Sequence, residues 1–176
     1  MWKFDTAVLV KASIFSAIVI ALQISGLGSI PVPNLSGSMT TLIIPVILAT
    51  VLCGPVVGLI AGTVMGFLYL VLPATASFGP IVLIPPRIFM VICAWFSYKY
   101  AHKFLPKNIS IILASGLAAL TNTATAVGIA IILQLVQPSI VLAVLPQAII
   151  ELVGSMFLVP IIYRALYSAA PNLAID

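Results

Sequence analysis

The sequence predicts an all-α membrane protein, a bundle of six transmembrane helices whose N and C termini both lie in the cytoplasm. Two features of composition favour this class. Of the 176 residues, 63% are hydrophobic and 6% are charged, so most of the chain cannot face water. The apolar runs are as long as a bilayer is thick, and short polar segments or segments with Pro and Gly separate them. We therefore expect one transmembrane domain over residues 1–176.

Apolar stretches between helix breakers predict six helices. Their expected ranges are 7–25, 39–53, 55–72, 81–104, 108–135 and 139–168. The first run is expected to be a true span, because several more follow it and no cleavage pattern ends it. Residues 26–38, between the first two helices, contain too much Gly and Pro for a helix and are too long for a tight turn. They predict a shaped, functional loop.

The distribution of charge predicts the orientation. With six spans, six of the seven Lys and Arg residues and His102 map to the side of the termini, which is the cytoplasm by the positive-inside rule. The opposite loops, around 26–38, 73–80 and 136–138, carry no charge and are expected to face outward. The net charge of +4 does not indicate nucleic-acid binding, because no basic tail or aromatic-rich groove accompanies it. The six basic residues on that side are Lys3, Lys11, Lys99, Lys103, Lys107 and Arg164.

Two helices carry small residues at a four-residue spacing. The third helix has a glycine ridge, which predicts close packing against another helix; a sliding surface is the alternative. The first helix has two such sets, Ala12 with Ser16, and Ser13 with Ala17 and Ala21. We expect this face to contact a neighbour in this chain or in another. The ridge consists of Gly54, Gly58, Gly62 and Gly66.

Arg87 and Glu151 are the two ionisable residues that fall within the hydrocarbon, where each is costly unless it is paired or faces a wet cavity. Pro85 and Pro86 precede Arg87, so the fourth helix is expected to break or begin there, with free backbone N–H groups beside the guanidinium. That combination suits a carboxylate or a phosphate. The alternative is an Arg87–Glu151 ion pair that only fixes helix packing.

Other polar residues are also expected within the membrane spans. On the sixth helix, Gln147, Glu151 and Ser155 recur every four residues, and such a stripe must face the bundle interior. Asn122 on the fifth helix cannot easily satisfy its amide on its own backbone. Together these groups predict a small polar pocket that opens outward. Its expected ligand-binding residues are Arg87, Glu151, Gln147, Asn122, Asn34 and Ser36.

Four segments in order resemble the substrate-binding S components of energy-coupling factor (ECF) vitamin transporters. They are the Gly- and Pro-rich outer loop, then residues 38–47 (SMTTLIIPVI), 54–62 (GPVVGLIAG) and 84–88 (IPPRI). The similarity runs over essentially the whole chain. It implies six helices with cytoplasmic termini in a prokaryotic plasma membrane, a vitamin pocket near the outer face, and a lid made by the first outer loop.

The resemblance also implies partners. S components work with a transmembrane coupling subunit and two ATPase subunits, and no cofactor is expected in the S component itself. The small-residue motif that contacts the coupling subunit falls on Ala12 and Ser16, or in the next register on Ser13 and Ala17. The ligand is expected to be a small water-soluble vitamin. One Arg in the pocket favours an anionic compound such as pantothenate, while pyrimidine, pyridoxine, riboflavin and cobalamin uptake remain open.

Two other classes of function are alternatives to a transporter subunit. A stand-alone carrier or sensor of the same fold would purify without ATPase subunits. A membrane enzyme acting on a lipid or isoprenoid would require an acidic metal motif, and the sequence has none. It also lacks a catalytic Ser-His-Asp or Cys-His set and a Walker A loop, so no catalytic or metal-binding residues are expected.

Overall fold

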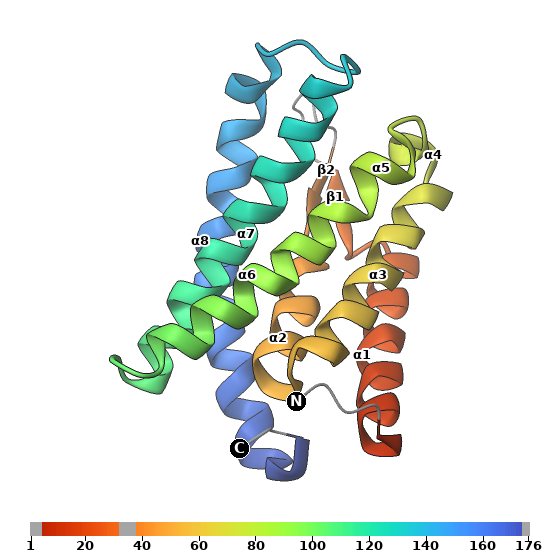
Figure 1. Ribbon diagram of the computed structural model, residues 1–176. Coiled ribbons are helices and arrows are strands. Elements are labelled where there is room, and N and C mark those ends of the chain that lie inside the picture. The colour runs from red at the N-terminus through yellow and green to blue at the C-terminus, as the bar shows by residue number, and fades with distance from the viewer. Residues whose placement is uncertain (1–4, 32–37, 174–176) are drawn as a thin grey trace.

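The structure is a computed structural model that describes residues 5–31 and 38–173, and it is a helical bundle with one short hairpin (Figure 1). The all-α membrane class is confirmed. In chain order the elements are α1 (Thr6–Ile24), β1 (Ser29–Pro31), β2 (Ser38–Thr40), α2 (Ile43–Cys53), α3 (Pro55–Val71), α4 (Pro73–Ala76), α5 (Gly79–Leu83), α6 (Pro85–Ala101), α7 (Lys107–Ile132), α8 (Ile140–Ala169) and a 3-10 turn, η1 (Pro171–Leu173).

The described residues contain four helical segments that are long and apolar enough to cross a membrane. They are α1, α5 with α6 as Gly79–Ala101, α7 and α8. Large apolar side chains point outward from these helices, for example Leu9, Phe89 and Phe157. Hydrocarbon is the solvent that suits such a surface. The helix α3, with 17 residues, lies at the lower limit for a span.

The central helix α2 differs from the expected span over 39–53. It begins at Ile43, has 11 residues and covers about 16 Å, which is too short to cross a bilayer alone. The expectation is wrong at the N-terminal end because residues 38–40 pair with β1 in an antiparallel hairpin, with Thr40 opposite Ser29. Nearly every residue of α2 is buried, and α1, α3, α6 and α8 all pack against it.

The glycine ridge packs α3 closely against α2 and α6. A Cβ atom added to Gly58 would lie 2.1 Å from Thr50 Oγ1 on α2. One added to Gly66 would lie 3.2 Å from the Cα atom of Ile84, just before α6. Gly54 has a φ of 93° at the turn between α2 and α3, a conformation that suits glycine. The ridge therefore serves the close packing that its spacing predicts.

The expected fourth helix, 81–104, is broken at Ile84 into α5 and α6. Pro85 and Pro86 occupy the first turn of α6, where a missing N–H group costs little. One expectation here is wrong: the N–H groups of Arg87 and Ile88 are not free, because both donate to the carbonyl oxygen of Ile84. The break therefore positions the Arg87 side chain but does not supply backbone donors to a ligand.

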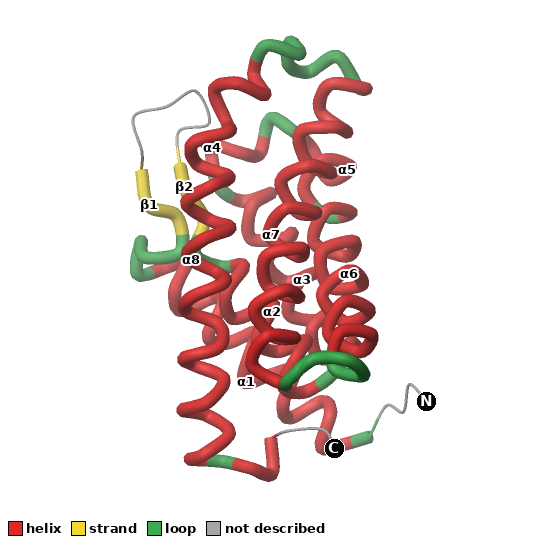
Figure 2. The backbone as a smooth tube through the Cα atoms, turned by 90° about the vertical axis from the view of Figure 1, so that its left-hand side faces the viewer, coloured by secondary structure: helices red, strands yellow, loops and turns green. Residues whose placement is uncertain are grey.

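The two ends of the bundle differ in chemistry. The start of α1 lies beside η1, because Lys11 Nζ donates to the carbonyl oxygen of Leu173 at 2.9 Å. At the same end, Lys107 Nζ lies 4.1 Å from the centroid of the Tyr167 ring. The hairpin, α4 and the α7–α8 connection lie at the opposite end (Figures 1 and 2).

Candidate functional site

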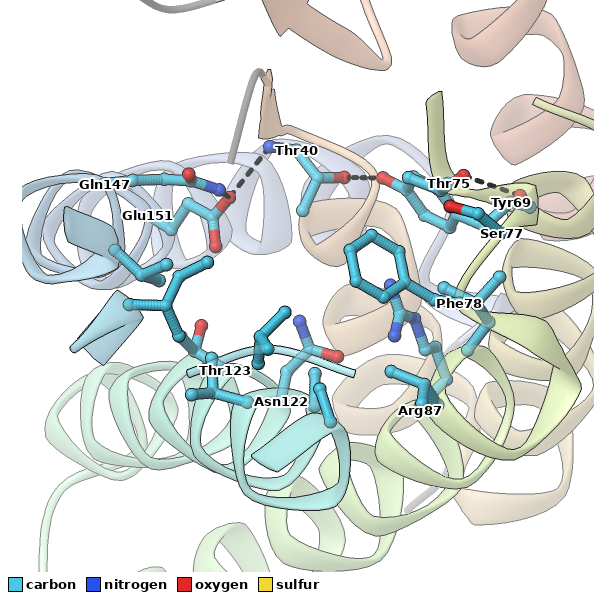
Figure 3. Close-up of a pocket in the computed structure, with 18 residues that line it drawn as sticks. Thr40, Tyr69, Thr75, Ser77, Phe78, Arg87, Asn122, Thr123, Gln147 and Glu151 are labelled. Carbon is cyan, nitrogen blue, oxygen red and sulfur yellow. Dashed lines mark hydrogen bonds between the residues drawn. The ribbon is translucent and has the colours of Figure 1, made fainter. Parts of the chain in front are cut away.

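A cavity of about 340 Å³ lies between α3, α6, α7, α8 and β2, toward the hairpin end of the bundle. This volume is at the small end of the range for small-molecule sites, about 300–1,000 Å³. Much of the wall is apolar, with Phe78, Val82, Val127 and Val144 among its residues. Its polar wall residues, shown in Figure 3, are Thr40, Tyr69, Thr75, Ser77, Arg87, Asn122, Thr123, Gln147 and Glu151.

The structure brings together four of the residues expected to bind a ligand. Arg87 comes from α6, Asn122 from α7, and Gln147 and Glu151 from α8, and all four line this cavity. The other two expected residues, Asn34 and Ser36, lie outside the described residues. A distant set of polar side chains thus converges on one small volume, which is how ligand sites in helical bundles are built.

Arg87 is buried, with 7% of its surface exposed. Its guanidinium carbon lies 4.9 Å from the centroid of the Tyr69 ring, a cation–π contact between α6 and α3. Within the described part of the chain, Arg87 Nε has no hydrogen-bond partner. The guanidinium is therefore held against an aromatic ring, and its enclosed Nε atom lacks a hydrogen bond within the described residues.

Glu151 lies across the cavity from Arg87 (Figure 3). It is 6% exposed, and its Oε1 atom accepts hydrogen bonds from the Thr40 backbone N–H at 2.8 Å and from Gln147 Nε2 at 3.0 Å. No ion pair joins Glu151 to Arg87 in the described residues, so direct neutralisation of one by the other is not the arrangement found. Two buried charges of opposite sign instead face one cavity.

Thr40 and Tyr69 belong to the site although sequence reasoning did not select them. The Tyr69 hydroxyl donates to Thr40 Oγ1, and Thr40 also binds Glu151 through its backbone. These contacts join β2 to α3 and α8. A tyrosine within an apolar helix and a threonine beside a loop look like ordinary packing residues, so only the tertiary arrangement identifies them.

The remaining polar candidates divide between the cavity and the helix interfaces. Asn122 is 5% exposed, and its Oδ1 atom has no hydrogen-bond partner among the described residues. Ser155, the third member of the α8 stripe, does not line the cavity: its hydroxyl donates to the carbonyl oxygens of Leu152 and Ser115. The stripe therefore contributes Gln147 and Glu151 to the site and Ser155 to the packing of α8 on α7.

On α1 the two small-residue registers face different directions. Ala12 is buried in the bundle, and the hydroxyl of Ser16 is also buried. Ser13 and Ala17 are exposed, and the Ser13 hydroxyl donates to the carbonyl oxygen of Leu9 on its own helix at 2.9 Å. The outward surface therefore consists of Ser13, Ala17 and Ala21, which we call the α1 small-residue face.

Two further features bear on other kinds of site. A second hollow of about 370 Å³ lies at the α7–α8 connection, lined by Ile131, Gln134 and four residues that follow them, and no charged side chain lines it. In residues 5–31 and 38–173, no group of three His, Cys, Asp or Glu side chains is placed to hold a metal ion. The cavity with Arg87 and Glu151 is thus the candidate with the chemistry to select a polar solute.

A helical membrane bundle that encloses a small cavity with buried charged groups has the features of a membrane-embedded binding protein. The family model described as ECF transporter, substrate-specific component, matches residues 7–163. The chain belongs to this family. It is therefore a multi-pass membrane subunit of a transporter, of the kind that binds a small-molecule substrate and associates with an ECF module. A comparison with curated proteins found no match.

Proposed function

We propose that this S component captures a small water-soluble vitamin, or a related metabolite with an anionic group, in the cavity beside Arg87. The solute enters from the outer face of a prokaryotic plasma membrane. It is then taken up with energy from ATP through a coupling module of one transmembrane subunit and two ATPase subunits. The observation that carries the proposal is the buried Arg87 guanidinium, which lines the cavity and forms no ion pair with a carboxylate of the described residues.

The electrostatics of the site support an anionic ligand. A guanidinium in hydrocarbon surroundings loses its hydration, and this loss is not offset here by a carboxylate in direct contact. A carboxylate or phosphate of a solute would form charge-assisted hydrogen bonds with it, and these are stronger in a medium of low dielectric constant. Binding of an anion therefore removes a cost that the empty site carries.

The charges at the two ends support entry from outside. Lys99, Lys103, Lys107 and Arg164 lie near the end opposite the cavity, which the positive-inside rule assigns to the cytoplasm. The connections at the cavity end, among them residues 133–139, contain no charged residue. The cavity volume of about 340 Å³ also favours a metabolite of the size of pantothenate over a cobalamin.

The proposal is tested by ligand binding to the purified full chain in lipid nanodiscs. A thermal-shift panel of vitamins identifies the ligand, since a solute at 100 times its Kd adds about 2.7 kcal/mol to stability. Calorimetry then compares the wild type with Arg87→Ala, and the expected loss is roughly 10- to 150-fold in affinity, the value of a charged hydrogen bond of about 1.5–3 kcal/mol.

The matched control is Arg164→Ala. Arg164 lies near the other end of the bundle, on α8, where its Nε atom donates to Asn108 Oδ1 at 3.0 Å. Its removal is expected to leave affinity within about twofold, since surface interactions of this kind contribute little. Equal affinity of Arg87→Ala and wild type would overturn the assignment of the anion to Arg87.

A further inference from the structure

Two opposite charges line the cavity, and neither is neutralised by direct contact with the other. Arg87 and Glu151 are each more than nine-tenths buried, and no ion pair connects them within the described chain. Burial of a charge without a partner is costly, and the cost is greatest in a membrane. A solute that bound only the Arg87 guanidinium would leave the free-energy cost of burying the Glu151 carboxylate unchanged.

One oxygen of the Glu151 carboxylate can accept a hydrogen bond from a ligand. Both of its hydrogen bonds with described residues, from Thr40 and Gln147, end on Oε1. Figure 3 shows the other oxygen of Glu151 directed away from these two donors and toward the cavity. A carboxylate oxygen only accepts hydrogen bonds, so the group that it binds must be a donor.

The opposite side of the cavity has the reverse character. Arg87 presents N–H donors there and Asn122 lies beside it, as Figure 3 shows. Side chains without polar groups, such as Phe78, Val127 and Val144, occupy much of the wall elsewhere. The cavity thus has a guanidinium, which only donates hydrogen bonds, on one side and a carboxylate on the other, with an apolar lining around them.

We infer that the cavity selects a two-ended solute, with a carboxylate or phosphate bound at Arg87 and an N–H or O–H donor bound at Glu151, joined by a short apolar middle. The inference rests on the proposed function and narrows its ligand class. A solute with the anion alone leaves Glu151 unsatisfied, and a solute with the donor alone leaves Arg87 unsatisfied. Each such solute forfeits a charged hydrogen bond, so its affinity is lower by about tenfold or more.

The test uses matched solutes and the full chain in nanodiscs, with binding measured by calorimetry and thermal shift. The two-ended probes are 4-aminobenzoate, pantothenate and pyridoxamine 5′-phosphate. Benzoate keeps the anion of 4-aminobenzoate without its amino donor, and aniline keeps the donor without the anion. Panthenol and pyridoxamine are the relatives of the other two probes that lack the anion. We expect each two-ended solute that binds to do so at least about tenfold more tightly than its one-ended relatives.

A second arm uses Glu151→Gln, which keeps the side-chain shape and an oxygen that accepts from Thr40. The variant is expected to lower the affinity of the two-ended solute about tenfold or more, but to change the affinity of its anion-only relative less than about twofold. An unchanged unfolding temperature without solute confirms that the variant is folded.

The two failures are distinguishable. A one-ended solute that binds as tightly as its two-ended relative overturns this inference and leaves the proposed function standing, as does an equal effect of Glu151→Gln on both relatives. Absence of binding by every probe, including the vitamins of the wider panel, overturns the proposed function and this inference with it.

Discussion

At Arg87, the fold fixes the side chain before any ligand arrives. The two prolines before it begin α6 at the right place, and the Tyr69 ring lies against the guanidinium. A side chain that is already ordered loses less conformational freedom on binding, so more of the interaction energy appears as affinity. The tyrosine hydroxyl has a separate task, since it donates to Thr40 Oγ1 and connects α3 to the hairpin.

These two tasks of Tyr69 can be separated by substitution. Tyr69→Phe removes the hydroxyl and keeps the ring, whereas Tyr69→Leu removes both. A cation–π contact contributes about 0.5–2 kcal/mol, so Tyr69→Leu is expected to bind the ligand roughly 2- to 30-fold more weakly than Tyr69→Phe. Calorimetry on the two variants gives this ratio. Equal affinities would contradict a role for the ring in holding Arg87.

Sequence alone predicts those residues of the site whose side chains are costly, and therefore rare, inside a membrane. Arg87 and Glu151 stand out because ionisable groups in hydrocarbon are costly, and Asn122 stands out because its amide needs a partner. Thr40 and Tyr69 follow no such rule. Their place in the site comes from the pairing of β2 with β1 and from the packing of α3 on α6, which no local pattern encodes.

At the scale of the element, the limits of the apolar stretches gave good boundaries for three helices. The helices α1, α3 and α8 begin and end within one residue of their expected ranges. They failed for α2, which starts later than expected because residues 38–40 form a strand that pairs with β1. A short apolar run does not by itself distinguish a buried helix from a transmembrane helix.

The contact between α3 and α2 depends on the absence of a side chain at Gly58. Gly58→Ala would place a Cβ atom 2.1 Å from Thr50 Oγ1, so the helices must separate or Thr50 must move. We expect the variant to lose about 1–3 kcal/mol of stability, the usual cost of overpacking. Thermal unfolding of the purified chain in nanodiscs measures the change.

Gly154→Ala on α8 is the matched control for this substitution. An added Cβ atom at Gly154 would meet nothing within 4 Å, and alanine favours a helix over glycine by up to about 1 kcal/mol. The control is therefore expected to be neutral or slightly stabilising. Equal stability of the two variants would show that the glycine ridge does not set the distance between α3 and α2.

At the scale of the whole molecule, the cavity, the basic residues and the α1 small-residue face lie in different parts of the bundle. The cavity lies toward the hairpin end, basic residues gather toward the other end, and the α1 small-residue face is on the outside of the bundle. Small residues let another helix approach closely in a membrane. Of the two registers left open by the sequence, the one with Ser13 and Ala17 is the one accessible to a partner, because Ala12 is buried.

Ala17→Leu is expected to weaken assembly with the coupling module by roughly tenfold or more, because a bulky side chain prevents close approach of the partner helix. Solute binding by the isolated chain should be unchanged. Co-purification of the ATPase subunits with the tagged chain measures assembly, and recovery of the wild type without them would instead favour a stand-alone carrier.

The control for this variant is Ala124→Leu, a similar change at an exposed alanine on α7. It adds the same bulk to a different side of the bundle and is expected to leave co-purification intact. Equal recovery of the ATPase subunits with Ala17→Leu and with the wild type would remove the α1 small-residue face from the interface.

The most direct measurement is an experimental structure of the full chain in a nanodisc with its identified solute bound. The account predicts the solute in the cavity between α3, α6, α7 and α8, with an anionic group within hydrogen-bonding distance of the Arg87 guanidinium. Solute bound instead in the uncharged hollow at the α7–α8 connection, with an Arg87–Glu151 ion pair closing an empty cavity, would contradict it.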